Sequence, residues 1–146
     1  MATTLEVERQ LSNAGYLPQG VDFSPRFSAP ADIEGIVRGA ATRYGIDPDQ
    51  ATAIARLESG LNPRAQNPRS SAGGLFQFIN STWSQYGGGD KYDPARNADA
   101  GARYLRDVRD TLTRGLGRAP TVGELYLGHQ QGPAGALRIL QNPDGL

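Results

Sequence analysis

Three short stretches decide how this chain is interpreted. Residues 58–63 are Glu-Ser-Gly-Leu-Asn-Pro, residues 71–78 are Ser-Ala-Gly-Gly-Leu-Phe-Gln-Phe, and residues 81–83 are Ser-Thr-Trp. A helical pattern precedes the first stretch, and the Pro, Ser, Asn and Gly residues between the first two are typical of a loop. We therefore expect a helix, a long loop and a short helix in this order.

Glu58 is the most informative residue of the first stretch. It follows Ile54 by four residues and Ala55 by three, so it lies at the edge of the apolar face of its helix. Partial burial there would raise the pKa of the carboxyl group, as a general acid requires. The helix ends at Gly60, which places Glu58 beside the loop. An ordinary glutamate at a helix boundary is the alternative.

The rest of the chain also predicts helices from Pro30 onward. Apolar residues at helical spacing, N-cap residues and terminal glycines or prolines mark their limits. Strand signals are scarce, so we expect an all-α fold, with residues 1–29 as an extended arm or linker and residues 30–146 as one domain. The expected helices cover residues 31–44, 47–60, 80–87, 93–114, 121–127 and 133–140.

Composition excludes several classes of function. The 15 basic and 15 acidic residues of this 146-residue chain balance, which argues against a nucleic-acid-binding surface. The chain has no Cys and one His, so no metal site is expected, and no motif predicts a cofactor. No apolar run approaches the length of a membrane span, and polar residues interrupt the N-terminus where a signal peptide would need an apolar stretch.

The three stretches, in this order, resemble the Glu-Ser motif, the Gly-Leu-Met-Gln motif and the following helix of lytic transglycosylases, which have a lysozyme-like fold. Asp93-Pro94, Asn97, residues 100–102 and Tyr104-Leu105 are similar to the next block of that family. The resemblance covers about residues 31–140. Its last block departs from the family pattern Ala-Tyr-Asn-Ala-Gly-Pro-Gly, because His129 replaces the tyrosine and Gln130 the asparagine, while Gly132-Pro133 is kept.

The resemblance implies a role for each matching residue. Glu58 would be the sole catalytic carboxyl group, Ser59 would orient Glu58 or the substrate, and Gln77 would bind the N-acetyl sugar. His129 and Gln130 would line the substrate groove, with His129 at a helix end or turn. Structural alternatives stay open: helix capping for Ser59, a loop hydrogen bond for Gln77, and a backbone-bonded histidine at 129.

The implied reaction is cleavage of the β-1,4 bond between N-acetylmuramic acid and N-acetylglucosamine in peptidoglycan, closing a 1,6-anhydro ring. A goose-type muramidase of the same fold is the main alternative, with Asp90 or Asp93 positioning a water. A catalytically silent wall-binding or virion module is another. The expected setting is a phage virion, with a conjugation or secretion machine as the alternative. The protein would act in the periplasm or cell wall, with glycan strands and other proteins of that assembly as partners.

Overall fold

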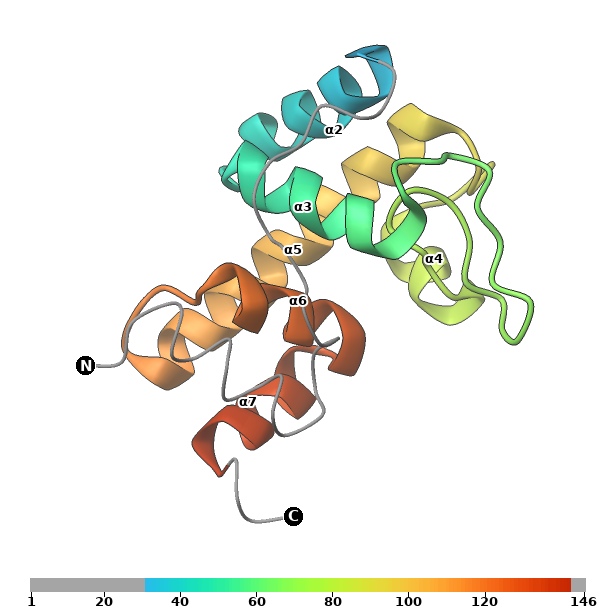
Figure 1. The fold of residues 1–146 in the computed structure, drawn as a ribbon. Coiled ribbons are helices and arrows are strands. Elements are labelled where there is room, and N and C mark those ends of the chain that lie inside the picture. Colours follow the sequence, from blue (N-terminus) through green and yellow to red (C-terminus); the bar gives the residue numbers. More distant parts are fainter. Residues whose placement is uncertain (1–30, 143–146) are drawn as a thin grey trace. The chain divides into compact units, whose positions relative to one another are not determined.

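The computed structural model describes residues 31–142, which form helices joined by loops (Figure 1). No strand occurs in this range, where the only β-type pairings are two isolated antiparallel bridges, Gln66–Gly73 and Gly73–Phe78. The predicted all-α class is therefore confirmed, while the predicted arm, residues 1–29, lies outside the described residues. The helices are α2 (Ala31–Arg43), α3 (Pro48–Ser59), α4 (Asn80–Tyr86), α5 (Pro94–Leu116), α6 (Val122–Gln131) and α7 (Pro133–Gln141).

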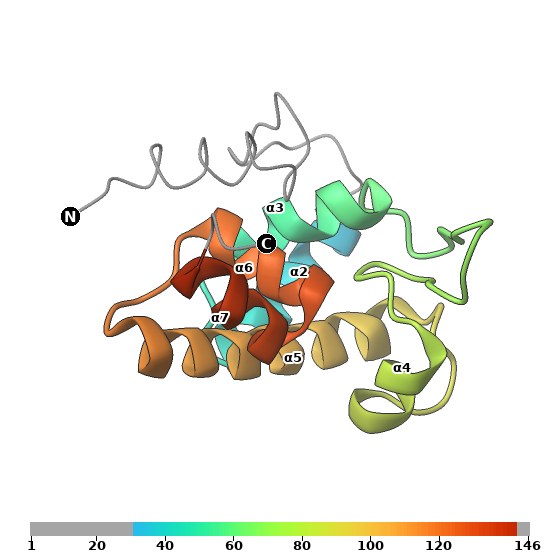
Figure 2. The same cartoon turned by 90° about the horizontal axis from the view of Figure 1, so that it is seen from below.

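Contacts divide these residues into two compact units, a first unit of residues 31–104 and a second unit of residues 105–142. Helix α5 runs through the boundary, since Tyr104 belongs to the first unit and Leu105 to the second. Figure 2 shows α5 from the side as one uninterrupted helix.

The caps of α3 agree with the prediction. Asp47 accepts a hydrogen bond from the backbone N–H of Asp49 (2.8 Å), and Pro48 occupies the first helical position. Gly60 ends the helix with φ 64° and donates to the carbonyl of Arg56 (2.8 Å). Sequence and structure therefore place Glu58 in the same last turn.

The predicted end of α6 at Leu127 is wrong, because the helix continues for one more turn to Gln131. A capping box lies at its start, with Thr121 and Glu124 bonded reciprocally. The helix continues through Gly128. Glycine is present there because the backbone packs closely against Val108, which a Cβ would overlap. Gly132 (φ 78°) ends α6, and the next residue, Pro133, begins α7.

The core of the first unit fixes the α3–α4 loop against α5. Ile54, Leu75 and Phe76 are completely or almost completely buried. Gly101, in the middle of α5, lies against the ring of Phe76, where any Cβ would overlap it. This close contact with the loop explains why the helix tolerates a glycine, which costs about 1 kcal/mol relative to Ala.

In the second unit, α6 packs against α7, and one ion pair is placed at the start of α6. Arg118 donates to both carboxylate oxygens of Glu124, at 2.8 Å each, and Glu124 is 1% exposed. Glu124 also accepts the backbone N–H of Thr121 (2.8 Å). A buried carboxylate is tolerated here because a bidentate guanidinium and a backbone donor both reach it.

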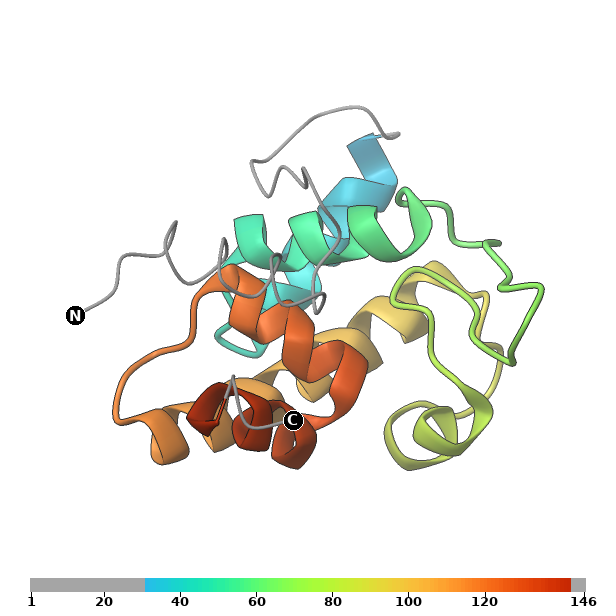
Figure 3. The same ribbon diagram turned by 60° about the horizontal axis from the view of Figure 1, so that its bottom comes forward.

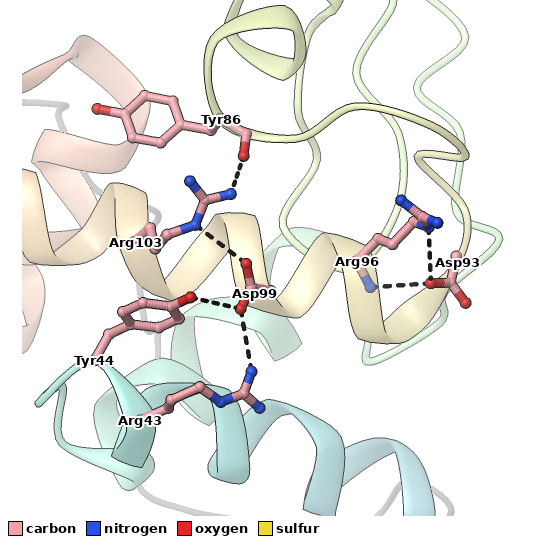
Figure 4. Close-up of polar contacts among 7 residues, drawn as sticks. All are labelled: Arg43, Tyr44, Tyr86, Asp93, Arg96, Asp99 and Arg103. Carbon is pink, nitrogen blue, oxygen red and sulfur yellow. Dashed lines mark hydrogen bonds and ion pairs between the residues drawn. The ribbon is translucent and has the colours of Figure 1, made fainter.

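Asp99 on α5 joins three segments of the first unit (Figure 4). It accepts hydrogen bonds from Arg43 (3.1 Å) at the end of α2, from Tyr44 (2.8 Å) directly after it, and from Arg103 (3.1 Å) one turn along α5. Arg103 also donates to the carbonyl of Tyr86, the last residue of α4. Burial alone would raise the pKa of Asp99, but the bonds from Tyr44 and Arg43 and the positive charge of Arg103 outweigh it, and the pKa is lowered.

The lowered pKa predicts a pH dependence of stability. Asp99 is charged more readily in the folded than in the unfolded chain, so its contribution is complete above the ordinary pKa of 3.8 and is lost as the pH falls through the folded value. Asp99→Asn should therefore lower the urea midpoint clearly at pH 6 and less at pH 3. Asp107→Asn, which removes a half-exposed carboxylate 3.9 Å from Arg106, is the control. An equal loss at both pH values for Asp99→Asn would contradict the prediction.

Candidate active site

Glu58 lies in the last helical turn of α3, and its side chain is half-buried, as the sequence predicted. Directly after it the chain changes direction through two consecutive residues with left-handed backbone, Gly60 (φ 64°) and Leu61 (φ 60°). The Leu61 side chain is 2% exposed, so its burial fixes this turn. Glu58 is therefore carried on a rigid helix end, next to an anchored change of chain direction.

The segment between α3 and α4, residues 61–79, is called the site loop here; it leaves α3 and returns to α4 without regular structure (Figure 3). Leu61 begins it, and Gln77 (φ 53°) lies near its end. These two are the residues other than glycine with positive φ within 31–142. Such backbone costs on the order of 1–3 kcal/mol and persists only where surrounding structure imposes it. Both strained positions therefore belong to the loop beside Glu58.

Ser59 connects the helix that carries Glu58 to the site loop. Its hydroxyl lies 3.0 Å from the carbonyl oxygen of Ala55, one turn earlier, and 2.8 Å from that of Leu75 in the loop. A serine hydroxyl has a single proton, so it can donate to one of these oxygens at a time. The contact with Ala55 corresponds to the helix-capping alternative for Ser59. The contact with Leu75 joins α3 to the Gly-Gly-Leu-Phe-Gln stretch of the site loop.

The Gln77 side chain makes hydrogen bonds within the site loop, which was the structural alternative to sugar binding. Its amide nitrogen donates to the carbonyls of Ala65 (3.1 Å) and Gly74 (2.9 Å), which together occupy both N–H groups. The two carbonyl partners identify this atom as the nitrogen, so the amide oxygen is the end that remains for a ligand. No donor to that oxygen is found among residues 31–142. Gln77 is therefore a preoriented hydrogen-bond acceptor.

Asn97 on α5 fixes the site loop from the other side. Its side chain is completely buried, accepts the backbone N–H of Phe76 (2.8 Å), and donates to the carbonyls of Lys91 (2.9 Å) and Gly73 (3.4 Å). A Cβ at Gly74 would overlap this amide, so the glycine is required for the approach. The sequence placed Asn97 in a family block but assigned it no function.

Lys91 also holds the loop, and nothing in the sequence pointed to it beyond its being the single lysine of the chain. Its ammonium group donates to the carbonyl of Ser71 (2.8 Å) and to the side chain of Asn80 (2.7 Å), the first residue of α4. Burial lowers the pKa of Lys91, because the charged form loses water there. Lys91 therefore ties the loop to the start of α4.

The two acids of the muramidase alternative have structural partners. Asp93 precedes α5 and accepts the backbone N–H of Arg96 (3.1 Å), so it is the N-cap of this helix. Asp90 accepts the backbone N–H of Tyr92 (2.9 Å) in the preceding turn. Both carboxylates thus stabilise the connection into α5.

The aromatic residues near the loop are mainly packing residues. Trp83 is 8% exposed and donates to the carbonyl of Gly89 (3.1 Å), so it belongs to the core. Tyr104 is half-buried, and burial raises its pKa. It packs against Phe78 and Tyr86, with ring centroids 6.0 and 5.1 Å away.

His129 and Gln130 belong to the last turn of α6, in the second unit. His129 is half-buried, while Gln130 is exposed and donates to the hydroxyl of Tyr126 (3.4 Å). A helix-end position for His129 agrees with the prediction, although the helix is longer than expected. The hydrogen bonds that Ser59, Gln77 and Asn97 make in the site loop lie within residues 55–97, so neither His129 nor Gln130 takes part in them.

Residues 31–142 contain no group of three or more His, Cys, Asp or Glu side chains arranged to hold a metal ion. None of the helices in this range is both long and apolar enough to cross a membrane.

Comparisons with known proteins identify the family of this chain. The chain is 31% identical over 122 residues to membrane-bound lytic murein transglycosylase C of Edwardsiella ictaluri (strain 93-146), an alignment covering 75% of this chain and 34% of the relative. It is 34% identical over 92 residues to the protein of that name from Pectobacterium atrosepticum (strain SCRI 1043), covering 56% of this chain and 26% of the relative. The chain thus spans about a third or less of each relative. The family model for the transglycosylase SLT domain matches residues 35–130, and the chain belongs to this family.

Proposed function

We propose that this chain is a peptidoglycan lytic transglycosylase that cleaves the β-1,4 bond between N-acetylmuramic acid and N-acetylglucosamine and releases 1,6-anhydro products. The observation that carries the proposal is the Glu58-Ser59 pair at the end of α3, with Ser59 bonded to the loop that presents Gln77. The family match over residues 35–130 supports it, as do the names of the two relatives.

In the proposed reaction, Glu58 performs both proton transfers. Its protonated carboxyl group gives a proton to the leaving glycosidic oxygen, while the substrate's acetamido group stabilises the positive charge at C1. The resulting carboxylate takes the proton of the sugar's own 6-hydroxyl, whose oxygen then bonds to C1 and closes the anhydro ring. Because no water attacks, one carboxyl group is sufficient. The first step requires the protonated carboxyl group of Glu58, which is half-buried at the end of α3.

The proposed roles of Gln77 and Ser59 follow from the contacts of their side chains. The amide oxygen of Gln77 would accept the N–H of an acetamido group, because its nitrogen is already occupied by two loop carbonyls. Ser59 would act by holding the loop and Glu58 in register. His129 and Gln130 are proposed to bind the glycan on the family resemblance alone, and a His129→Ala variant with full activity on sacculi would remove that role.

The products of purified sacculi test the reaction type. We expect 1,6-anhydro-muropeptides, lighter by one water than hydrolytic products, in the mass spectrum of the released fragments. Reducing-end products would instead establish a muramidase and direct attention to Asp90 and Asp93. The capping bonds of both acids favour the transglycosylase, since each already stabilises a turn or a helix start.

We further propose that the protein acts on the wall from a phage virion or a secretion machine, together with other proteins of that assembly. The proposal rests on the sequence alone. Mass spectrometry of purified virions or of the isolated machine would support it by finding the chain there. Recovery of the chain only from the host envelope, and from neither assembly, would contradict it.

A further inference from the structure

The site loop carries positive charge without any acidic residue. Residues 59–89 contain no Asp or Glu, although the whole chain has 15 of them, and the only charged side chains in this stretch are Arg64 and Arg69. Both arginines are exposed. A chain with zero net charge therefore has a local cationic surface directly after Glu58.

These two arginines also differ from the others of the first unit in their partners. The described part of the unit has seven arginines, and five of them form ion pairs with carboxylates at 2.9–3.8 Å. Within residues 31–142 no carboxylate pairs with Arg64 or Arg69. The paired arginines are Arg38, Arg43, Arg56, Arg96 and Arg103.

Each of the two arginines is presented by the same local structure. The tripeptide Asn-Pro-Arg occurs twice, at residues 62–64 and 67–69. In both copies the asparagine side chain accepts the backbone N–H of the arginine, at 3.0 Å for Arg64 and 2.8 Å for Arg69. The proline and this turn restrict the backbone, so less conformational entropy is lost when the arginine binds a ligand.

The loop contacts place the arginines beside the residues proposed to bind substrate. Ala65, the neighbour of Arg64, accepts hydrogen bonds from the side chain of Gln77 (3.1 Å) and from the backbone of Gly74 (2.9 Å). Asn67 donates its backbone N–H to Ala72 (3.0 Å), so Arg69 lies in the turn that this bond closes. Arg64 is thus next to the Gln77 contact, and Arg69 lies further out along the same loop.

We propose that Arg64 and Arg69 form a carboxylate-binding subsite that recognises the stem peptides of the glycan strand. This inference rests on the proposed function, because the ligand is a substituent of that substrate. A guanidinium group suits carboxylates, to which it can donate two parallel hydrogen bonds. Stem peptides carry free carboxylates and project from the muramic acid residues, so a strand whose acetamido group contacts Gln77 brings such groups to the neighbouring loop.

The test is binding to teichoic-acid-free sacculi, measured by co-sedimentation of the full chain carrying Glu58→Gln so that no cleavage occurs. Adding Arg64→Gln and Arg69→Gln should weaken the apparent affinity by about three- to tenfold at low salt, the effect of two exposed ion pairs. At about 0.5 M salt the difference should disappear, because screening removes the attraction.

Two further substrates identify the ligand. Sacculi whose carboxylates have been converted to methylamides should bind the parent and the double variant equally. Glycan strands stripped of peptide by an amidase carry only the lactyl carboxylate. They should also bind both proteins equally, whereas a difference kept on stripped strands would assign the site to the lactyl group and overturn the stem-peptide assignment.

Arg114→Gln with Arg138→Gln is the matched control. It removes the same charge from two exposed arginines of the second unit that also lack an ion pair within the described residues. An equal loss in this control would attribute the effect to net charge and overturn the subsite, as would unchanged binding by the Arg64/Arg69 variant. The function proposal fails separately, if the chain with Glu58 intact releases no anhydro products from the same sacculi.

Discussion

Glu58→Gln is expected to abolish cleavage of sacculi while leaving the fold intact. General acid or base catalysis contributes about 10²–10⁴-fold to a rate, and here a single carboxyl group serves as acid and then as base. Glutamine has the same shape but can neither donate a proton to the leaving oxygen nor accept one from the 6-hydroxyl. The half-buried position at the end of α3 should accommodate the amide without repacking.

The measurement is the rate of muropeptide release, alongside circular dichroism and a thermal melt of each variant. Asp107→Asn removes a half-exposed carboxylate on α5 and should retain the parental rate, which controls for the loss of one charge. Asp90→Asn and Asp93→Asn should also cleave, at most with a small loss of stability from the weakened turn or cap. Full activity of a folded Glu58→Gln protein would remove Glu58 from the mechanism.

Asn97→Ala should produce the largest loss of stability among single substitutions at the site. Three backbone groups would lose their partner: the N–H of Phe76 and the carbonyls of Lys91 and Gly73. Each buried group left unsatisfied costs about 1–3 kcal/mol, so we expect the free energy of unfolding to fall by about 3–5 kcal/mol in total. Loop order should fall with it, and activity should decline even where the protein remains folded.

Urea unfolding measures this loss, and Asn80→Ala is the control. Asn80 is exposed and accepts one bond from Lys91 (2.7 Å), so its removal should cost well under half as much. Asn97→Asp offers a sharper comparison, because the carboxylate still accepts the Phe76 N–H but meets the two carbonyls without a proton to donate. A loss below about 1 kcal/mol for Asn97→Ala would show that water or a shifted loop replaces its bonds.

The helices were predictable because their signals are local. Helix α3 begins at the N-cap Asp47 with Pro48 and ends at Gly60, and a capping box begins α6. Each of these signals lies within a few residues of the helix end that it marks. The end of α6 was missed for a tertiary reason. Gly128 is a weak helix residue by propensity, and its close packing against Val108 is not visible in the sequence.

The site was predictable only where a motif marked it. The family pattern made Glu58, Ser59 and Gln77 candidates, but it did not predict the hydrogen-bond partners of Ser59 and Gln77. The contributions of Asn97 and Lys91 were missed, because most of their bonds go to main-chain carbonyls, which every residue type presents equally. A hydrogen bond to a backbone oxygen leaves no trace in the identity of the residue that accepts it.

Because the site loop is held through its backbone atoms, the exposed side chains in its outer part can be substituted without loss of these bonds. Ser59, Lys91 and Asn97 hold the loop at backbone atoms of residues 71–76 and at the carbonyl of Lys91 itself. Replacing the exposed side chains at Arg64, Gln66 or Arg69 would remove none of these attachments. A library randomised at these three positions would therefore vary the exposed surface of the site loop while the backbone attachments beside Glu58 are retained.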